Sequence, residues 1–185
     1  MIKRKAIVRK LPSVETLGCA SVICSDKTGT LTQNKMTVTR LWINDELVQV
    51  TGGGYEPKGD FSLGGLKVSF YQKPYIRRML EYGLLCNNAS LQQEEKEEGA
   101  LFKRKQVYWD IMGDPTEGAL LVVAAKAGLW KEELEKSYRR VEEFPFDSSR
   151  KMMSVVVENQ FGDRRVITKG APDVLLDRCT HVFWA

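Results

Sequence analysis

The sequence has few of the residues on which several kinds of catalytic and metal site depend. It contains one histidine, His181, in 185 residues. A Ser-His-Asp or Cys-His centre would have to use that imidazole, and we expect His181 to lie at the surface instead. The four cysteines, Cys19, Cys24, Cys86 and Cys179, form no CxxC pair. We therefore expect buried free thiols in a reducing compartment rather than disulfides or a zinc site.

Long apolar runs and concentrated charge are also lacking. The longest purely apolar run covers residues 119–125, far short of the roughly 20 residues that cross a bilayer, so no membrane helix is expected. The net charge is +4, and basic residues are dispersed except in 1–10 and 102–106, so we expect no nucleic-acid binding. With 43% hydrophobic and 28% charged residues, the composition is that of one or two soluble globular domains.

A P-loop is absent as well. The glycines and lysine of "GGGYEPKG" stand in the wrong order for GxxxxGK[ST]. A nucleotide bound by this chain would therefore be held in another way than by a P-loop.

Apolar periodicity, proline positions and capping residues predict five helices. Ser13 is the expected N-cap of the first, with Glu15 in its first turn. The third is apolar nearly all round, as a buried helix is. The five cover residues 11–18, 74–86, 113–128, 131–137 and 171–179.

Strands are expected where β-branched and apolar residues lie between polar turns. Residues 19–25 have the pattern of a buried parallel strand that ends at a polar turn. The glycine-rich residues 51–65 and the acidic residues 92–99 are predicted to be loops. The other predicted strands are a pair within 36–50 around Asn44-Asp45, one over 106–112, and a pair over 152–158 and 164–170 with a turn between them.

Asp26 follows the first predicted strand, in the stretch "CSDKTGTLT". A carboxylate at the carboxyl edge of a parallel sheet lies where ligands of α/β sheets bind. Gly29 allows the backbone to approach a phosphate closely, and Thr28 and Thr30 supply hydroxyl donors. The pattern alone leaves two interpretations open: a polar turn that ends a strand, or a nucleophile that takes a phosphoryl group while Mg2+ offsets the charge.

The stretch "AIVRKLPSVETLGCASVICSDKTGTLTQNKMTV" closely resembles the phosphorylation-site region of P-type ATPases, most nearly the calcium pumps of the sarco/endoplasmic-reticulum type. By this resemblance Asp26 accepts the γ-phosphoryl group of ATP as an acyl phosphate. Asp26 and Thr28 would ligate Mg2+, Thr28 through its carbonyl, and Thr30 would hold the phosphoryl group. Lys27 belongs to the same catalytic motif.

Three further stretches are similar to the nucleotide-binding segments of that family. "MGDPTEGALL" carries the acidic residue that approaches the adenine amino group, and "EEFPFDSSRKMMSV" carries the aromatic residue that stacks on adenine, with a lysine nearby. "TKGAPDVLLDRC" matches the KGA motif, whose lysine lines the floor of the ATP pocket. The implied ATP-binding residues are Glu117, Phe146, Lys151, Lys169, Gly170 and Ala171.

Taken one at a time, these residues also fit plain structural roles. Phe146 fits a core aromatic, Glu117 fits an acidic residue that favours a helix N-terminus, and Lys169 fits a solvated lysine at the end of a strand. Their order and spacing downstream of DKTGT favour the family interpretation.

The resemblance implies an α+β architecture in two parts. Residues 1–35 would be an incomplete α/β, haloacid dehalogenase-like phosphorylation domain with the DKTGT loop. Residues 36–185 would be the ATP-binding nucleotide domain, a twisted antiparallel sheet flanked by helices. A lone parallel strand needs neighbours on both sides, so we expect the residues before about Met36 to be poorly ordered or packed differently from those of a pump.

The implied function is that of the cytosolic portion of a cation pump, for Ca2+ by overall similarity, on the cytoplasmic side of a membrane. The family's membrane helices, TGE loop and GDGxNDxP segment are not in this sequence, so the expected partners are ATP, Mg2+ and the remainder of the pump. The chain itself should be monomeric, bind ATP weakly and leave Asp26 unphosphorylated. Two alternatives are a soluble phosphotransferase or phosphatase of the haloacid dehalogenase type, against which FPFD and KGA argue, and a nucleotide-binding module without chemistry.

Overall fold

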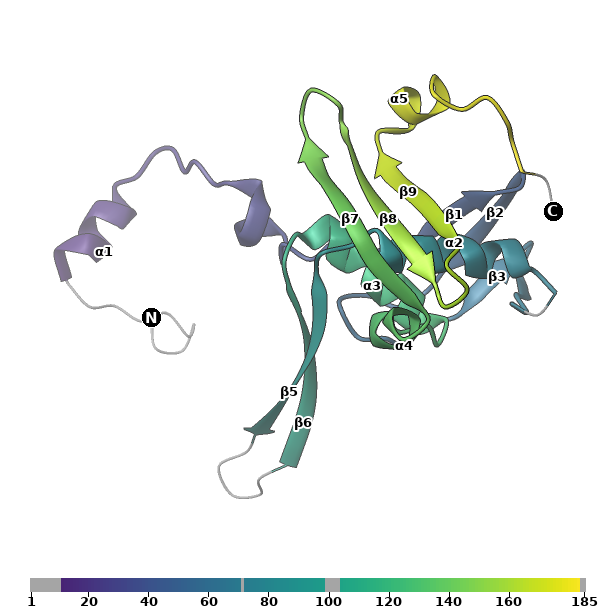
Figure 1. Cartoon of the computed structure of the whole chain (residues 1–185). Helices are drawn as coiled ribbons and strands as arrows, with labels where there is room; N and C mark the ends of the chain where they lie inside the picture. The colour runs from purple at the N-terminus through teal and green to yellow at the C-terminus, as the bar shows by residue number, and fades with distance from the viewer. Residues whose placement is uncertain (1–10, 71, 99–103, 184–185) are drawn as a thin grey trace. The chain divides into compact units, whose positions relative to one another are not determined.

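The chain divides into two units, Met1–Asn34 and Lys35–Ala185. The computed structural model describes residues 11–70, 72–98 and 104–183. Within these ranges the first unit contains helix α1 (Leu11–Gly18) and a wide turn, η2 (Lys27–Leu31). The described residues of the second unit form nine strands and the helices α2 to α5 (Figure 1).

The first unit differs from two of the expectations. Helix α1 has the predicted bounds, but Ser13 lies inside it, so its prediction as the N-cap is wrong. Residues 19–25 form no strand, and Val22 and Ile23 are exposed. A parallel strand needs partners to satisfy its backbone groups, and the described part of this unit contains no sheet. The α/β segment that the resemblance implies is therefore not seen there.

The strands of the second unit pair antiparallel in three sheets. The α+β class and the antiparallel pairing are confirmed. The prediction of a single sheet is wrong, because the strands form three separate sheets. The first sheet has the order β1 (Arg40–Ile43), β2 (Glu46–Val50), β3 (Phe61–Leu63) and β4 (Leu66–Lys67). The second is β5 (Ser90–Glu98) with β6 (Arg104–Met112), and the third is β7 (Tyr138–Asp147), β8 (Met152–Asn159) and β9 (Arg164–Gly170).

Two of the predicted loops contain strands. Phe61, in the glycine-rich stretch, is buried in β3 opposite Val50 of β2. The acidic stretch belongs to β5, which pairs with β6 along its whole length, with Glu94 opposite Tyr108. Cross-strand pairing outweighs the low β-propensity of glutamate there. The hairpin extends away from the helices, as Figure 1 shows.

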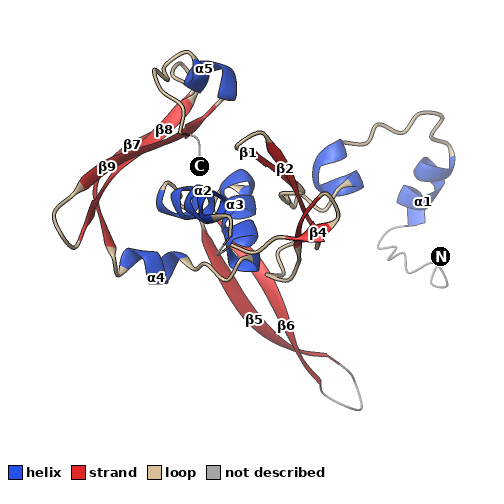
Figure 2. Cartoon of the chain, turned by 90° about the vertical axis from the view of Figure 1, so that its right-hand side faces the viewer, coloured by secondary structure: helices blue, strands red, loops and turns tan. Residues whose placement is uncertain are grey.

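The helices form where proline and capping residues favour them. They are α2 (Pro74–Leu85), α3 (Pro115–Lys126), α4 (Lys131–Glu135) and α5 (Pro172–Leu176). Proline opens α2, α3 and α5, where its missing N–H costs no hydrogen bond. Figure 2 shows α2 and α3 between the β1–β2 strands and the β7–β9 strands. Helix α5 is shorter than predicted.

Two apolar clusters hold the second unit together. The first joins β1, β2 and β3 to α2 and α3, through Leu41, Val48, Val50, Phe61, Ile76, Leu80, Leu84, Ala89, Leu121, Val123 and Ala124. The second joins the end of α2 to β8 and β9, through Leu85, Cys86, Met153, Val155, Val157 and Ile167. Alternate residues of β8 face this cluster, as the two-residue period of a strand requires. Helix α2 therefore links the first sheet to the third.

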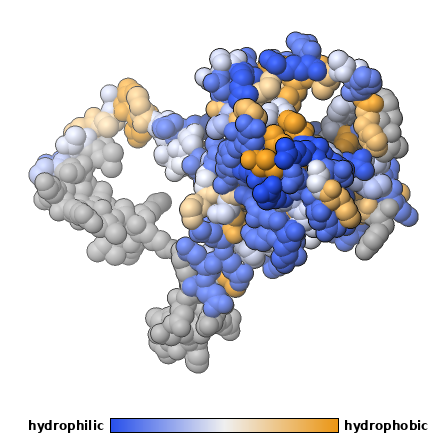
Figure 3. Space-filling model, viewed as in Figure 1, coloured by the Kyte–Doolittle hydropathy of each residue, from blue (hydrophilic) through white to orange (hydrophobic). Residues whose placement is uncertain are grey.

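The surface agrees with the charged composition. Hydrophilic side chains predominate on the face of the second unit seen in Figure 3, with hydrophobic residues scattered among them. All four cysteines are free, as predicted. Only Cys86 is buried, so the prediction of burial is wrong for Cys19, Cys24 and Cys179. His181 is exposed, as predicted. None of the helices in the described ranges is long and apolar enough to cross a membrane.

Candidate functional site

Glu117 lies in the first turn of α3, which Asp114 caps. One carboxylate oxygen of Asp114, Oδ1, accepts hydrogen bonds from the main-chain N–H groups of Thr116 (2.8 Å) and Glu117 (3.3 Å). Burial raises the pKa of Asp114, but the hydrogen bonds from Thr116 and Glu117, with the charge of Lys169, outweigh it, so this pKa lies below its ordinary value. The cap fixes where α3 begins and thus where Glu117 projects.

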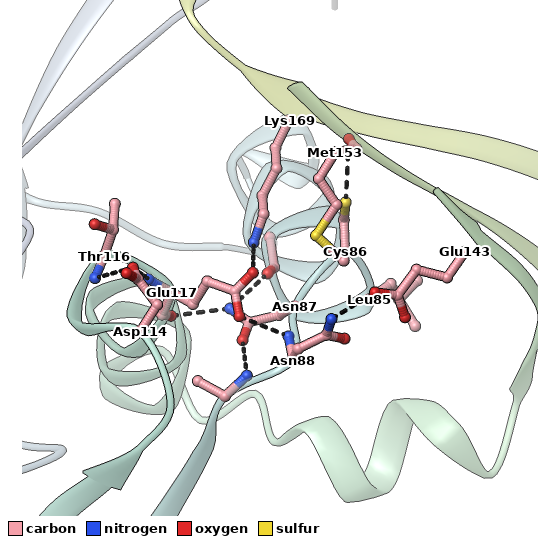
Figure 4. A network of polar contacts seen from close by, with 12 residues as sticks. Leu85, Cys86, Asn87, Asn88, Asp114, Thr116, Glu117, Glu143, Met153 and Lys169 are labelled. Carbon is pink, nitrogen blue, oxygen red and sulfur yellow. Dashed lines mark hydrogen bonds and ion pairs between the residues drawn. The ribbon is translucent and has the colours of Figure 1, made fainter. Parts of the chain in front are cut away.

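Glu117 and Lys169 form an ion pair between α3 and β9. Lys169 Nζ lies 2.6 Å from Glu117 Oε1, and the two side chains are only 26% and 16% exposed. The other carboxylate oxygen of Glu117 accepts a hydrogen bond from the main-chain N–H of Asn88 at 2.9 Å. Figure 4 shows this carboxylate held from both sides. The structure thus brings together two predicted ATP-binding residues.

Asn87, which is fully buried, ties the end of α2 to the start of α3. Its Nδ2 donates to the carbonyl oxygens of Glu117 (2.9 Å) and Gly83 (3.3 Å), and its Oδ1 accepts from the N–H of Ala89 (2.9 Å). A buried amide with all these partners stabilises one arrangement of the chain, because each unmade bond would carry a desolvation cost.

Lys151 lies beside the KGA segment at the start of β8. Its backbone is left-handed, with φ of 53°, and its carbonyl oxygen accepts from the N–H of Ala171 at 3.0 Å. A Cβ added to Gly170 would lie 2.4 Å from that same carbonyl oxygen, so only glycine fits there without a shift. Residues 169–171 and Lys151 are therefore held together by their main chains.

Phe146 is 65% exposed, at the irregular end of β7. It is therefore not a core aromatic. The following turn is closed by Asp147, whose Oδ1 accepts from the N–H groups of Ser149 (2.8 Å) and Arg150 (3.0 Å). The Ser149 hydroxyl and these N–H groups lower the pKa of Asp147. Arg150 also donates to the carbonyl of Pro145 at 2.8 Å, which fixes the segment that presents the ring.

An apolar cavity of about 630 Å3 lies next to the ion pair. Its wall includes Lys169 and Gly170, Tyr82 and Gly83 of α2, and Leu120 of α3. Its volume is in the range of about 300–1,000 Å3 typical of small-molecule sites. Glu117, Phe146 and Lys151 do not line it.

The residues of the DKTGT motif are in the first unit and are all exposed. The N–H of Thr28 donates to Asp26 Oδ1 at 3.4 Å, and the N–H of Thr32 donates to the carbonyl of Lys27 at 3.1 Å. Gly29 has φ of 75°, which this turn requires. Thr30 lies in the same turn. The motif thus forms a turn with an accessible carboxylate.

The fit of this turn to Mg2+ is partial. Asp26 and Thr28 offer oxygen ligands, which Mg2+ prefers, and the ion usually takes one or two carboxylates together with substrate phosphates and water. Within the described ranges no three His, Cys, Asp or Glu side chains cluster closely enough to hold a metal. These residues supply only part of a coordination sphere.

Sequence reasoning missed the residues that support Glu117. Asn87, Asn88, Arg140 and Glu143 were not singled out, yet all join the network of Figure 4 or its extension on β7. The pair of asparagines just beyond the end of an amphipathic helix is the one signal that pointed there, because short polar side chains bond the main chain near helix ends.

Loss of the α3 cap should weaken the fold. Asp114→Ala is expected to cost about 1 kcal/mol in the free energy of unfolding, because two N–H groups lose their acceptor. Urea denaturation measures it. Asp114→Asn keeps an acceptor oxygen and should lose clearly less, and equal losses in the two variants would contradict the capping role.

With the geometry established, comparison with known proteins identifies the class. The family profile described as "P-type ATPase, cytoplasmic domain N" matches residues 75–185. The chain belongs to the P-type ATPase family.

Relatives of known name agree with this. The chain is 53% identical over 184 residues to the calcium-transporting ATPase of Bacillus subtilis (strain 168), with 100% of this chain and 19% of that protein covered. It is 42% identical over 184 residues to the human calcium-transporting ATPase type 2C member 1, with 97% and 18% covered. It is 42% identical over 185 residues to the cation-transporting ATPase pma1 of Synechocystis, with 97% and 19% covered. The chain thus spans about a fifth of the length of these relatives.

Proposed function

We propose that this chain is the ATP-binding portion of a P-type pump that transports Ca2+ across a membrane, on whose cytoplasmic side it lies. The observation that carries the proposal is the Glu117–Lys169 ion pair at the start of α3. It joins two residues that the family motifs assign to one nucleotide. In this proposal residues 1–35 belong to the phosphorylation domain and residues 36–185 form the nucleotide domain.

Glu117 is suited to the adenine amino group. An ionised glutamate is only an acceptor, with room for about four hydrogen bonds on its two oxygens. Lys169 and the Asn88 N–H use two of these sites. The amino group of adenine is a donor and can bond to one of the remaining acceptor sites.

Phe146, Lys151 and Lys169 would hold the rest of the nucleotide. The exposed ring of Phe146 offers a face on which adenine stacks, a contact worth about 1–3 kcal/mol per base. Lys151 supplies positive charge for the phosphates, whereas Lys169, 2.6 Å from the Glu117 carboxylate, lies near the base on the floor of the pocket. Gly170, which has no Cβ, allows the backbone to pack closely against Lys151, and the N–H of Ala171 bonds to the Lys151 carbonyl oxygen.

Asp26 would carry out the chemistry of the parent pump. A carboxylate oxygen attacks the γ-phosphorus in line, the bond from that phosphorus to the bridging oxygen breaks, and ADP leaves. Water then cleaves the aspartyl-phosphate, which releases phosphate and restores Asp26. Mg2+ would offset the negative charge between carboxylate and triphosphate. Lys27, Thr28 and Thr30 would bind or orient the transferred group.

The stacking assignment is tested by a matched pair of phenylalanine variants. Phe146→Ala should weaken ATP binding about 5- to 150-fold, the range that corresponds to one stacked base, as measured by calorimetric titration. Phe161→Ala, which removes a ring that is 80% exposed on the β8–β9 turn, should leave the affinity unchanged. Equal affinities for Phe146→Ala and the unaltered chain would overturn the assignment.

A second candidate is an ATP-binding module that performs no turnover by itself. The described part of the first unit contains no sheet around Asp26, which favours it. Incubation of the chain with γ-labelled ATP and Mg2+ tests this candidate: ATP binding without label at Asp26 supports it, and hydroxylamine-sensitive label at Asp26 contradicts it.

A further inference from the structure

Three side chains behind Glu117 form a closed set of hydrogen bonds, which we call the β7 clamp: Asn88, Arg140 and Glu143. Arg140 Nη1 donates to Asn88 Oδ1 at 2.5 Å and to Glu143 Oε2 at 2.9 Å. Asn88 Nδ2 donates to the other oxygen of Glu143 at 2.6 Å. The amide of Asn88 is thus fixed at both its ends, although the residue itself is exposed.

The clamp also grips the end of α2. Arg140 Nη2 donates to the carbonyl oxygens of Leu85 (2.8 Å) and Asn87 (2.9 Å). Helix α2 has no basic residue in its own last turn, where a cation is favourable. Arg140 supplies that cation from β7. Both the main chain before Asn88 and the side chain of Asn88 are therefore held by one guanidinium group.

This grip fixes the direction of the Asn88 N–H together with Lys131, whose Nζ donates to the carbonyl oxygens of Asn87 (2.9 Å) and Ala89 (3.2 Å). That N–H donates to Glu117 Oε2 at 2.9 Å, on the side of the carboxylate away from its Lys169 contact. Figure 4 shows Asn88 between Glu117 and Glu143. Strand β7 also carries Phe146, so one strand bears both the clamp and the proposed stacking ring.

We propose that Asn88, Arg140 and Glu143 are positioning residues that orient the Glu117 carboxylate and thereby set the preference for a 6-aminopurine nucleotide. This inference rests on the proposed ATP site. It adds the prediction that side chains remote from the nucleotide determine which base is accepted.

The chemistry makes the effect specific to one base. Adenine presents an amino donor at position 6, whereas hypoxanthine, the base of inosine triphosphate, presents an oxygen acceptor there. A rigid carboxylate bonds the first and opposes the second, and leaving polar groups unpaired carries a large cost. A loosened Glu117 loses the bond to adenine and no longer opposes the oxygen of hypoxanthine.

Arg140→Met tests the clamp, with Arg139→Met as its control. Methionine keeps an apolar stem and removes every donor, and Arg139 is the neighbouring exposed arginine, paired with Glu158. Dissociation constants for ATP and inosine triphosphate are measured by calorimetry with the full chain. We expect Arg140→Met to weaken ATP binding by about 10-fold, because hydrogen bonds to a charged group are lost, and to leave inosine triphosphate binding unchanged or stronger. Equal loss for both nucleotides, or no loss, overturns the proposal.

If Arg140→Met does not fold, Asn88→Ala tests the positioning role of the β7 clamp instead. The position is exposed, so the substitution leaves no buried group without a partner, and it should lower the ATP preference in the same way. Glu117→Ala separates this inference from the function on which it rests. If Glu117→Ala leaves the ratio of the two affinities unchanged, the proposed adenine contact fails; if it alone lowers the ratio, only the clamp fails.

Discussion

Lys169→Met is expected to weaken ATP binding about 10- to 100-fold, because hydrogen bonds to charged groups contribute about 1.5–3 kcal/mol and each 1.4 kcal/mol is a factor of ten. The variant removes one positive charge from the wall of the cavity, which Arg78 also lines. It also leaves the Glu117 carboxylate, 16% exposed, without its ion-pair partner and free to repel the triphosphate. Both effects act in the same direction.

The control for this variant is Lys136→Met. Lys136 also pairs with a glutamate, Glu133, at 2.7 Å, but both side chains are largely exposed. Such surface pairs contribute only about 0–1 kcal/mol, so neither stability nor ATP affinity should change much. The double variant Lys169→Met/Glu117→Gln should recover part of the stability lost in Lys169→Met, since no unpaired carboxylate remains. Unchanged ATP affinity in Lys169→Met would contradict the assignment.

Leu84→Ala is expected to cost about 2–5 kcal/mol in the free energy of unfolding, the range for large-to-small changes in a packed core. Leu84 is 1% exposed and belongs to the first apolar cluster, on the helix that links the first sheet to the third. Because domains are stable by only about 5–15 kcal/mol in total, the variant should unfold at a much lower urea concentration. Asn87 and Asn88 follow directly on α2, so ATP binding should suffer as well.

Leu66→Ala is the matched control for the core variant. Leu66 is 77% exposed on the short strand β4, and surface substitutions usually stay within about 0.5 kcal/mol. Urea denaturation of both variants gives the comparison. A similar small loss in the two would mean that α2 does not depend on this cluster.

Local sequence signals predicted those elements in which they agree with the tertiary structure. Helix α3 has a capping aspartate, a proline at its first position and an apolar body, and it forms where expected. Strand β5 has four glutamates in nine residues and was predicted to be a loop. Its pairing with β6 could not be predicted from its own residues, because cross-strand partners determine β-structure more than local propensity does.

In the candidate site, too, local sequence patterns predicted individual residues but not their long-range contacts. Motif spacing identified Glu117 and Lys169, but their contact joins residues 52 positions apart and depends on how β9 packs on α2 and α3. The roles of Asn88 and Arg140 come from main-chain and side-chain bonds across 52 residues as well. No local pattern marks such partners, since an arginine on an amphipathic strand usually has a solvated side chain.

The most direct test of the ATP site is to follow the backbone amide signals of the chain by two-dimensional NMR while ATP is added. The largest shifts are predicted at Glu117, Phe146, Lys151 and residues 169–171, with the β5–β6 hairpin unaffected. Shifts confined to that hairpin, or to any region apart from the Glu117–Lys169 pair, would contradict the proposed site.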